Sequence, residues 1–119
     1  MARVETFEDL RVWQCSIALV KAVYVLSNSG QLKRDFGLRD QLRRAAVSIP
    51  TNIAEGFERA STKQYIYFLR ISKGSAGEVR SLLRVALEIG YVDQAAYGSL
   101  HHQVLQISRM LAKQIKSLQ

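Results

Sequence analysis

Two glutamates, Glu55 and Glu78, are the side chains of this 119-residue chain that come nearest to a reactive pair. Paired carboxylates serve general acid–base catalysis, or hold a metal ion when further ligands are nearby. No His, Asp or Cys stands close enough in the sequence to complete such a ligand set. A polar network that fixes two helices in register is therefore the favoured interpretation. We expect Glu78 to be partly buried and bonded to Asn52, whereas Glu55 either joins this network or faces solvent.

Other side chains that often carry chemistry are arranged unfavourably. His101 and His102 are adjacent, so on a helix they point about 100° apart and do not hold one metal ion together. The single Cys15 lies in an apolar run and is expected to be a small buried hydrophobe. The sequence has no phosphate-binding glycine loop, nucleophile elbow or zinc-ligand spacing. We therefore predict no enzyme activity, no cofactor and no metal.

Four helical segments are expected to position these residues. They run from about Thr6 to the polar cluster at 27–30, from about Asp35 to Arg59, from a cap at Ser61 or Thr62 to Gly90, and from a cap at Asp93 to the C-terminus. No window alternates apolar and polar residues for long enough to predict a strand. The sequence predicts an all-α fold, an antiparallel up-down four-helix bundle, in a single domain of residues 1–119.

Pro50 lies in the interior of the second segment. A proline there costs about 3 kcal/mol and leaves a carbonyl one turn earlier without its N–H donor. We expect a kink at Pro50 that packing around it stabilises. The small residues Gly74 and Ser75 are expected to let the third helix approach this kinked second helix.

Two motifs are more specific than the helical pattern: Pro50-Thr51-Asn52-Ile53-Ala54-Glu55-Gly56 and Gly74-Ser75-Ala76-Gly77-Glu78. With them the chain resembles, over nearly its whole length, the four-helix bundle proteins encoded in intervening sequences of bacterial 23S ribosomal RNA genes. These in turn resemble the accessory variability determinant proteins of diversity-generating retroelements, which are positively charged rings that bind nucleic acid and associate with a reverse transcriptase. The resemblance implies a ring of five chains with a central channel. The motif residues expected to have structural roles are Pro50, Asn52, Glu55, Gly56, Gly74, Ser75 and Glu78.

Apolar residues cover most of the circumference of the first segment: Val12, Trp13, Ile17, Leu19, Val20, Val23, Tyr24 and Leu26. A four-helix bundle covers one face of each helix, so this excess predicts contacts between subunits. A more central position of the helix within the monomer is the alternative. We expect a homo-oligomer, a pentamer by the resemblance, with Trp13 or Tyr24 in or beside the subunit contact.

The last segment has a narrower apolar stripe. Its residues recur at spacings of three and four, which is typical of the seam of a helical bundle. They are Tyr97, Leu100, Val104, Ile107, Leu111, Ile115 and Leu118.

Basic residues outnumber acidic ones and give the chain a formal net charge of +7. Residues 1–30 are balanced, whereas residues 61–92 carry five basic and two acidic side chains. These five cations fall on one face of the third predicted helix, opposite its apolar face: Lys63, Arg70, Lys73, Arg80 and Arg84. A second basic region on the second predicted helix consists of Arg43 and Arg44, with Lys33, Arg34 and Arg39 upstream. Solvated helix faces usually mix both signs of charge, so this pattern favours a polyanionic partner.

RNA or other nucleic acid is the polyanion that the pattern fits best. Each phosphate contacted by Lys or Arg releases counterions and adds affinity without reading sequence. The alternative is a protein–protein interaction scaffold whose basic face meets an acidic partner. The apolar runs are far shorter than the roughly 20 residues of a membrane span, and the N-terminus lacks a signal-peptide segment. We expect a cytoplasmic protein with no membrane partner.

Overall fold

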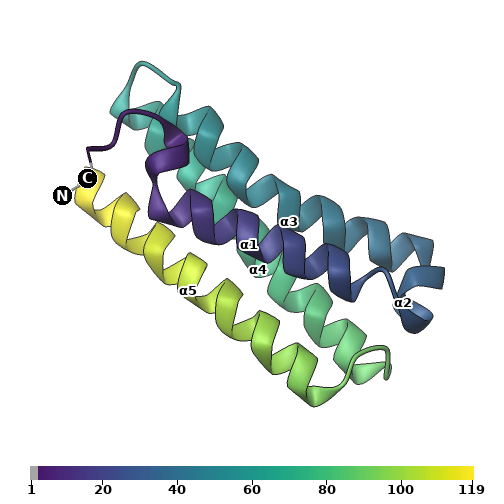
Figure 1. Ribbon diagram of the computed structural model, residues 1–119. Helices are drawn as coiled ribbons and strands as arrows, with labels where there is room; N and C mark the ends of the chain where they lie inside the picture. The colour runs from purple at the N-terminus through teal and green to yellow at the C-terminus, as the bar shows by residue number, and fades with distance from the viewer. Residues whose placement is uncertain (1–2) are drawn as a thin grey trace.

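The chain folds into helices joined by short connections (Figure 1). The computed structural model describes residues 3–119, so the first two residues of the predicted domain lie outside it. A 3-10 turn comes first and five α-helices follow: η1 Phe7–Asp9, α1 Arg11–Leu26, α2 Gly30–Arg34, α3 Phe36–Phe57, α4 Thr62–Glu88 and α5 Gln94–Leu118. Residues 3–119 contain no strand. The predicted all-α class is confirmed.

The four long helices lie alongside one another. α1 contacts α3 and α5, and α4 contacts the same two helices, so each long helix packs against two neighbours. In Figure 1 the chain reverses its direction at each connection between long helices. α2 is a helix of 5 residues in the connection between α1 and α3, where the sequence analysis predicted no helix.

Polar side chains cap the starts of α3, α4 and α5. The carboxylates of Asp35 and Asp93 accept hydrogen bonds from the N–H groups three residues later, at 3.1 and 2.8 Å. The Ser61 hydroxyl accepts in the same way at 3.1 Å. Each bond satisfies an N–H group that the first turn of a helix leaves without a partner. The predicted caps at Ser61 and Asp93 are therefore confirmed. Beyond the end of α4, Gly90 takes a φ of 81°, a conformation that favours glycine.

The N-terminal helix begins later than predicted. Thr6 precedes the short turn η1, and α1 starts only at Arg11. The Asp9 carboxylate accepts hydrogen bonds from the N–H groups of Glu5 and Thr6, at 2.9 and 3.1 Å. Both bonds stabilise the ionised carboxylate and hold the pKa of Asp9 below its usual range. The bond from the Glu5 N–H has the larger effect. The capping chemistry predicted near Thr6 thus serves η1.

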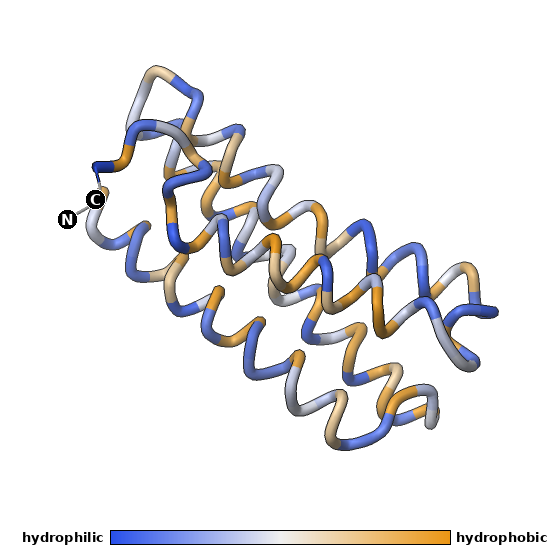
Figure 2. Tube along the Cα trace, in the orientation of Figure 1, coloured by the Kyte–Doolittle hydropathy of each residue, from blue (hydrophilic) through white to orange (hydrophobic). Residues whose placement is uncertain are grey.

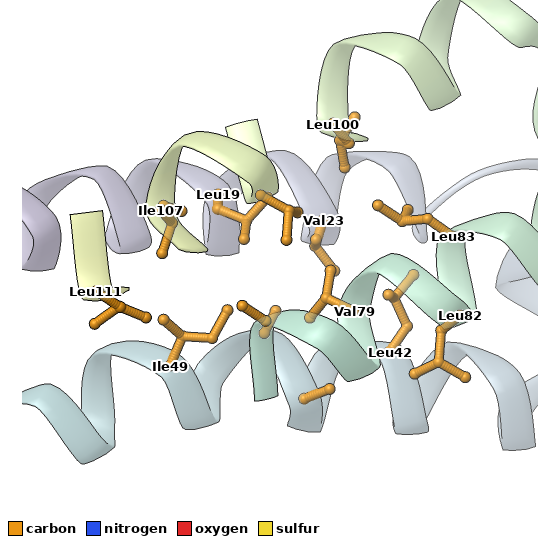
Figure 3. Close-up of a cluster of buried hydrophobic side chains, with 14 of the residues drawn as sticks. Leu19, Val23, Leu42, Ile49, Val79, Leu82, Leu83, Leu100, Ile107 and Leu111 are labelled. Atoms are coloured by element: carbon orange, nitrogen blue, oxygen red, sulfur yellow. The ribbon is translucent and has the colours of Figure 1, made fainter. Parts of the chain in front are cut away.

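Apolar side chains from all four long helices meet in one core (Figure 3). The buried stripe of α5 consists of Leu100, Val104, Ile107, Leu111 and Ile115, with Tyr97 and Leu118 half-buried beside it. Figure 2 shows hydrophobic and hydrophilic residues alternating along each long helix, as expected for helices with one buried face. The predicted seam of the last helix is confirmed. In residues 3–119, no helix is both long enough and apolar enough to cross a membrane.

Pro50 lies inside the continuous helix α3, as predicted. Three successive carbonyls just before it each accept a hydrogen bond from a side chain. Thr51 Oγ1 donates to the Val47 carbonyl at 2.8 Å, and Asn52 Nδ2 donates to the Ser48 carbonyl at 2.8 Å. Ser72 Oγ of α4 donates to the Ile49 carbonyl at 2.7 Å. The turn that proline weakens is therefore supported by side-chain donors.

Ser72 is buried and links α4 to this turn. Replacing it with alanine is expected to lower the free energy of unfolding by about 1 kcal/mol, because the Ile49 carbonyl loses a buried donor. Chemical denaturation followed by circular dichroism measures the change. The matched control is Ser81→Ala at an exposed position of the same helix, expected to stay within about 0.5 kcal/mol of the wild type. Equal stabilities for the two variants would contradict this role of Ser72.

Candidate nucleic-acid interface

The five predicted cations of α4 form one exposed strip, called the basic strip here: Lys63, Arg70, Lys73, Arg80 and Arg84. The opposite face of α4 is buried in the core, which fixes the strip toward solvent. From the first cation to the last the strip extends roughly 30 Å along the helix axis at the usual rise per residue. The sequence pattern thus located these five side chains on one outward face.

Few negative charges neutralise the basic strip. Arg84 pairs with Glu88 at 3.3 Å, and both side chains are about 60% exposed, so solvent screens this pair. The contact with Tyr97 has the larger effect and Glu88 the smaller in raising the pKa of Arg84 above its ordinary value. Within residues 3–119 the other four cations of the strip form no ion pair. Their charge is available to a ligand.

Arg43 and Arg44 of α3 do not behave alike. Arg43 is half-buried, and its Nε donates to the Ser27 hydroxyl at 2.8 Å. Its guanidinium also lies over the Tyr24 ring, 4.5 Å from the ring centre. These contacts hold α3 to the end of α1, so Arg43 serves the fold as well as the surface charge. Arg44 is exposed.

The predicted network around Glu78 is wrong. Glu78 is exposed, and the Asn52 amide donates within its own helix, to the carbonyl and to the hydroxyl of Ser48 at 2.8 and 2.9 Å. The Ser48 hydroxyl in turn bonds the Ser75 hydroxyl of α4 at 2.9 Å. Hydroxyl groups, rather than a carboxylate and an amide, therefore connect α3 to α4.

Glu55 faces solvent, which was one of the two alternatives. Its carboxylate pairs with Arg59 at 2.6 Å, one turn later on the same helix, and both side chains are roughly half-exposed. Glu55 lines a hollow between α1 and α3, whereas Glu78 is not among the residues that line it. Residues 3–119 hold no group of three or more side chains suited to a metal ion. The two glutamates do not share a site.

The two motif glycines have different surroundings. A Cβ added to Gly56 would lie 2.8 Å from the Phe68 side chain and 3.0 Å from that of Tyr65, so α4 comes very close to α3 here. A Cβ added to Gly74 would meet nothing within 4 Å. The predicted packing role of Gly74 is wrong because this residue lies on the exposed side of α4. Gly56 lies at the close approach of the two helices.

Apolar side chains also remain exposed on α4, beside the basic strip. We call them the apolar strip: Tyr67, Ile71, Val85 and Ile89, with exposed fractions of 60%, 36%, 42% and 51%. Their helical spacing puts them on one line that also contains Glu78. The sequence pattern did not predict this strip, because helical spacing does not give the rotation of α4 against its neighbours.

The fold and these surfaces define a class of protein: an all-helical protein with one basic and one apolar strip on the same exposed helix. The chain belongs to the 23S rRNA-intervening sequence protein family, whose model matches residues 8–113. It is also similar to the crystal structure of a protein of unknown function from the S23 ribosomal protein family of Bacteroides thetaiotaomicron. The TM-score is 0.82 at 24% identity, over 88% of this chain and 98% of that one. No curated protein matches the chain.

Proposed function

We propose that this protein binds nucleic acid, and RNA in particular, without catalysing a reaction. The basic strip of α4 is the main support for this proposal. Its five cations share one exposed helix face, and within residues 3–119 four of them form no ion pair. Such a row contacts phosphates, releases their counterions and gives affinity without sequence preference. A net charge of +7 adds long-range attraction to the same partner. We place the protein in the cytoplasm, without a membrane partner.

A scaffold for an acidic protein is the second candidate function. The exposed apolar strip favours it, because apolar side chains beside a charged row are typical of protein interfaces.

Titration of the wild-type protein with RNA over a series of salt concentrations separates the two candidates. Binding to unrelated RNA sequences alike is expected, with log affinity falling linearly with log salt concentration. Fluorescence anisotropy of end-labelled RNA measures the affinity. Absence of RNA binding at low salt would refute nucleic-acid binding and leave the scaffold.

The proposed working unit is a closed ring of antiparallel up-down four-helix bundles, each kinked at Pro50. Five chains per ring, and kinship with the retroelement accessory proteins, follow from the resemblance. Support for the protomer comes from the cyclic contacts of its four long helices and from the reversal of the chain at each connection (Figure 1). Support for the ring comes from two exposed apolar surfaces on different sides of the protomer, each with charged side chains beside it.

The first surface is the α1–α3 groove, made of two adjoining hollows of about 530 and 600 Å³ that share Val47 and Thr51. Trp13, Ile17 and Val20 of α1 line it and are half-buried. The second surface is the apolar strip of α4. If the apolar strip of one copy binds in the α1–α3 groove of the next, apolar surface that is exposed to solvent in each single copy becomes buried.

Charges at the two ends of the groove give the pairing a direction. Glu55 and Glu58 line the hollow at the C-terminal end of α3. Arg43 and Arg44 line the hollow at its N-terminal end together with Asp40, which is ion-paired with Arg39. The residues that line the groove are therefore more acidic at one end and more basic at the other.

The charge of α4 also differs between its two halves. Lys63, Arg70 and Lys73 accompany the N-terminal half of the apolar strip, whereas two glutamates balance Arg80 and Arg84 in the C-terminal half. Opposite charges meet at the N-terminal half when the neighbour's α4 starts at the glutamate end of the groove. The α4 helix of the same chain also starts at that end of α3, so neighbouring bundles point the same way. A head-to-tail contact of this kind repeats from copy to copy, and we propose that the repeated contact closes into a ring.

A further inference from the structure

A second hollow with basic walls lies where α1, α2 and α3 join. It has a volume of about 480 Å³ and is lined by Asn28, Ser29, Gly30, Lys33, Arg34, Phe36 and Arg39. Three of these residues are cations and none is acidic, which disfavours metal ions and favours anions. The volume is in the range of pockets that take small organic ligands. We call it the Phe36 hollow.

An exposed aromatic ring distinguishes this hollow from an ordinary basic patch. Phe36, the first residue of α3, is 64% exposed. The guanidinium of Arg39 lies over its ring, 4.7 Å from the ring centre. Arg39 is held there because it donates to the Lys33 carbonyl at 3.1 Å and to Asp40 at 2.8 Å. The bond from Arg39 lowers the pKa of Asp40, so this carboxylate stays ionised as its partner.

The backbone beside the ring is also fixed. Asp35 caps α3 through one carboxylate oxygen, and its other oxygen accepts a hydrogen bond from the Tyr91 hydroxyl at 3.1 Å. This bond ties the start of α3 to the connection between α4 and α5. Phe36 therefore presents its ring to solvent from a position that two hydrogen bonds hold in place, and little ordering is needed when a ligand stacks on it.

We infer that the Phe36 hollow binds an unpaired nucleotide of single-stranded nucleic acid. The base stacks on the aromatic ring, and Lys33 and Arg34, both exposed, contact its phosphates. Asn28 supplies an amide that matches the donors and acceptors of a base edge. The inference rests on the proposed function, and it adds a preference for unpaired over paired strands that the basic strip by itself does not provide. No residue of the basic strip lines the hollow.

Substitution of Phe36 tests the inference directly. Phe36→Ala and Phe36→Leu are expected to weaken binding of a single-stranded oligoadenylate about five-fold or more, whereas Phe36→Tyr retains the affinity because it keeps the ring. Duplex RNA of the same length should bind all variants equally, since its bases are already stacked. The slope of log affinity against log salt should not change, because no phosphate contact is lost. The control is Val25→Ala, at a residue that is 75% exposed on α1 and outside the hollow.

A fluorescent adenine analogue flanked by uridines, which stack weakly, reports stacking on the protein, since its emission falls when it stacks on a ring. Quenching is expected with the wild type and Phe36→Tyr and should be lost with Phe36→Leu. If the wild type binds strands but the Phe36 variants bind them equally well, the hollow is no base site, while the proposed function stands. If the wild type binds no nucleic acid, the proposed function itself fails. If only adenosine monophosphate binding responds to the substitutions, the site takes a free nucleotide and the assignment to a strand is overturned.

Discussion

Trp13→Glu is expected to convert the closed oligomer of the wild type, most simply five chains, into smaller species. The indole is half-buried in the α1–α3 groove, and a carboxylate there would be desolvated beside apolar side chains when a neighbour docks. Ile71→Glu should have the same effect from the opposite surface, because it places a charge in the apolar strip of α4. Sedimentation equilibrium measures the mass of each species. A wild type that stays monomeric at all concentrations would end the ring proposal.

Mixing the two variants gives a sharper result. In a head-to-tail contact, the Trp13→Glu copy keeps an intact α4 strip and the Ile71→Glu copy keeps an intact groove. One sound junction remains between them, so the mixture should form dimers while each variant alone stays monomeric.

Two additional variants control for folding and for surface charge. Val47→Glu, at a residue 39% exposed in the groove, repeats the test with little risk to the core. Val25→Glu adds the same charge to α1 outside the groove and should leave the oligomer intact. If Val25→Glu dissociates the oligomer as fully as Val47→Glu, the groove is not the contact.

The triple change of Arg70, Lys73 and Arg80 to Gln is expected to weaken binding of all RNA sequences alike. Each lost phosphate contact lowers the slope of log affinity against log salt by roughly 0.7 to 0.9, so the three changes should reduce the slope by about 2 to 3. Folding should persist, because all three side chains are exposed. Anisotropy titrations across a salt series measure both quantities, and sedimentation checks that the assembly is unchanged.

The matched control for this triple variant lies on α5. Arg109, Lys113 and Lys116 are exposed, and changing them to Gln removes the same net charge from a different face. This control should keep most of the wild-type affinity and slope. Equal RNA binding by the two triple variants would mean that the α4 strip is an ordinary solvated face, and the scaffold function would then be preferred.

Local signals in the sequence predicted the helices well. Ser61 and Asp93 act at the caps where they were expected, because an N-cap depends on a few neighbouring residues. The stripe from Leu100 to Ile115 is buried because a regular spacing of three and four needs no knowledge of the partner helix. Pro50 inside α3 was also predictable, since the apolar pattern continues on both sides of it.

The polar contacts between helices were not predictable to the same degree. Helical periodicity gives the relative angle of residues on one helix, but not the rotation of that helix against its neighbour. A small rotation of α4 decides whether Glu78 or Ser75 faces α3, and Ser75 does. Asn52 had a nearer acceptor in the preceding turn of its own helix than across the contact. The Phe36 hollow could not be predicted from the sequence pattern, because α2, which lines it, was not predicted.

The contact between α3 and α4 has consequences for internal motion. Ser72 bonds the Ile49 carbonyl, Ser75 bonds Ser48, and Gly56 lies against the side chain of Phe68. Sliding α4 past α3 by one turn would break both hydrogen bonds and force a side chain into the space beside the glycine. We therefore expect α3 and α4 to move as one rigid unit. The buried residues of α5 are all apolar, so its contacts with the core should resist sliding less than the contact between α3 and α4.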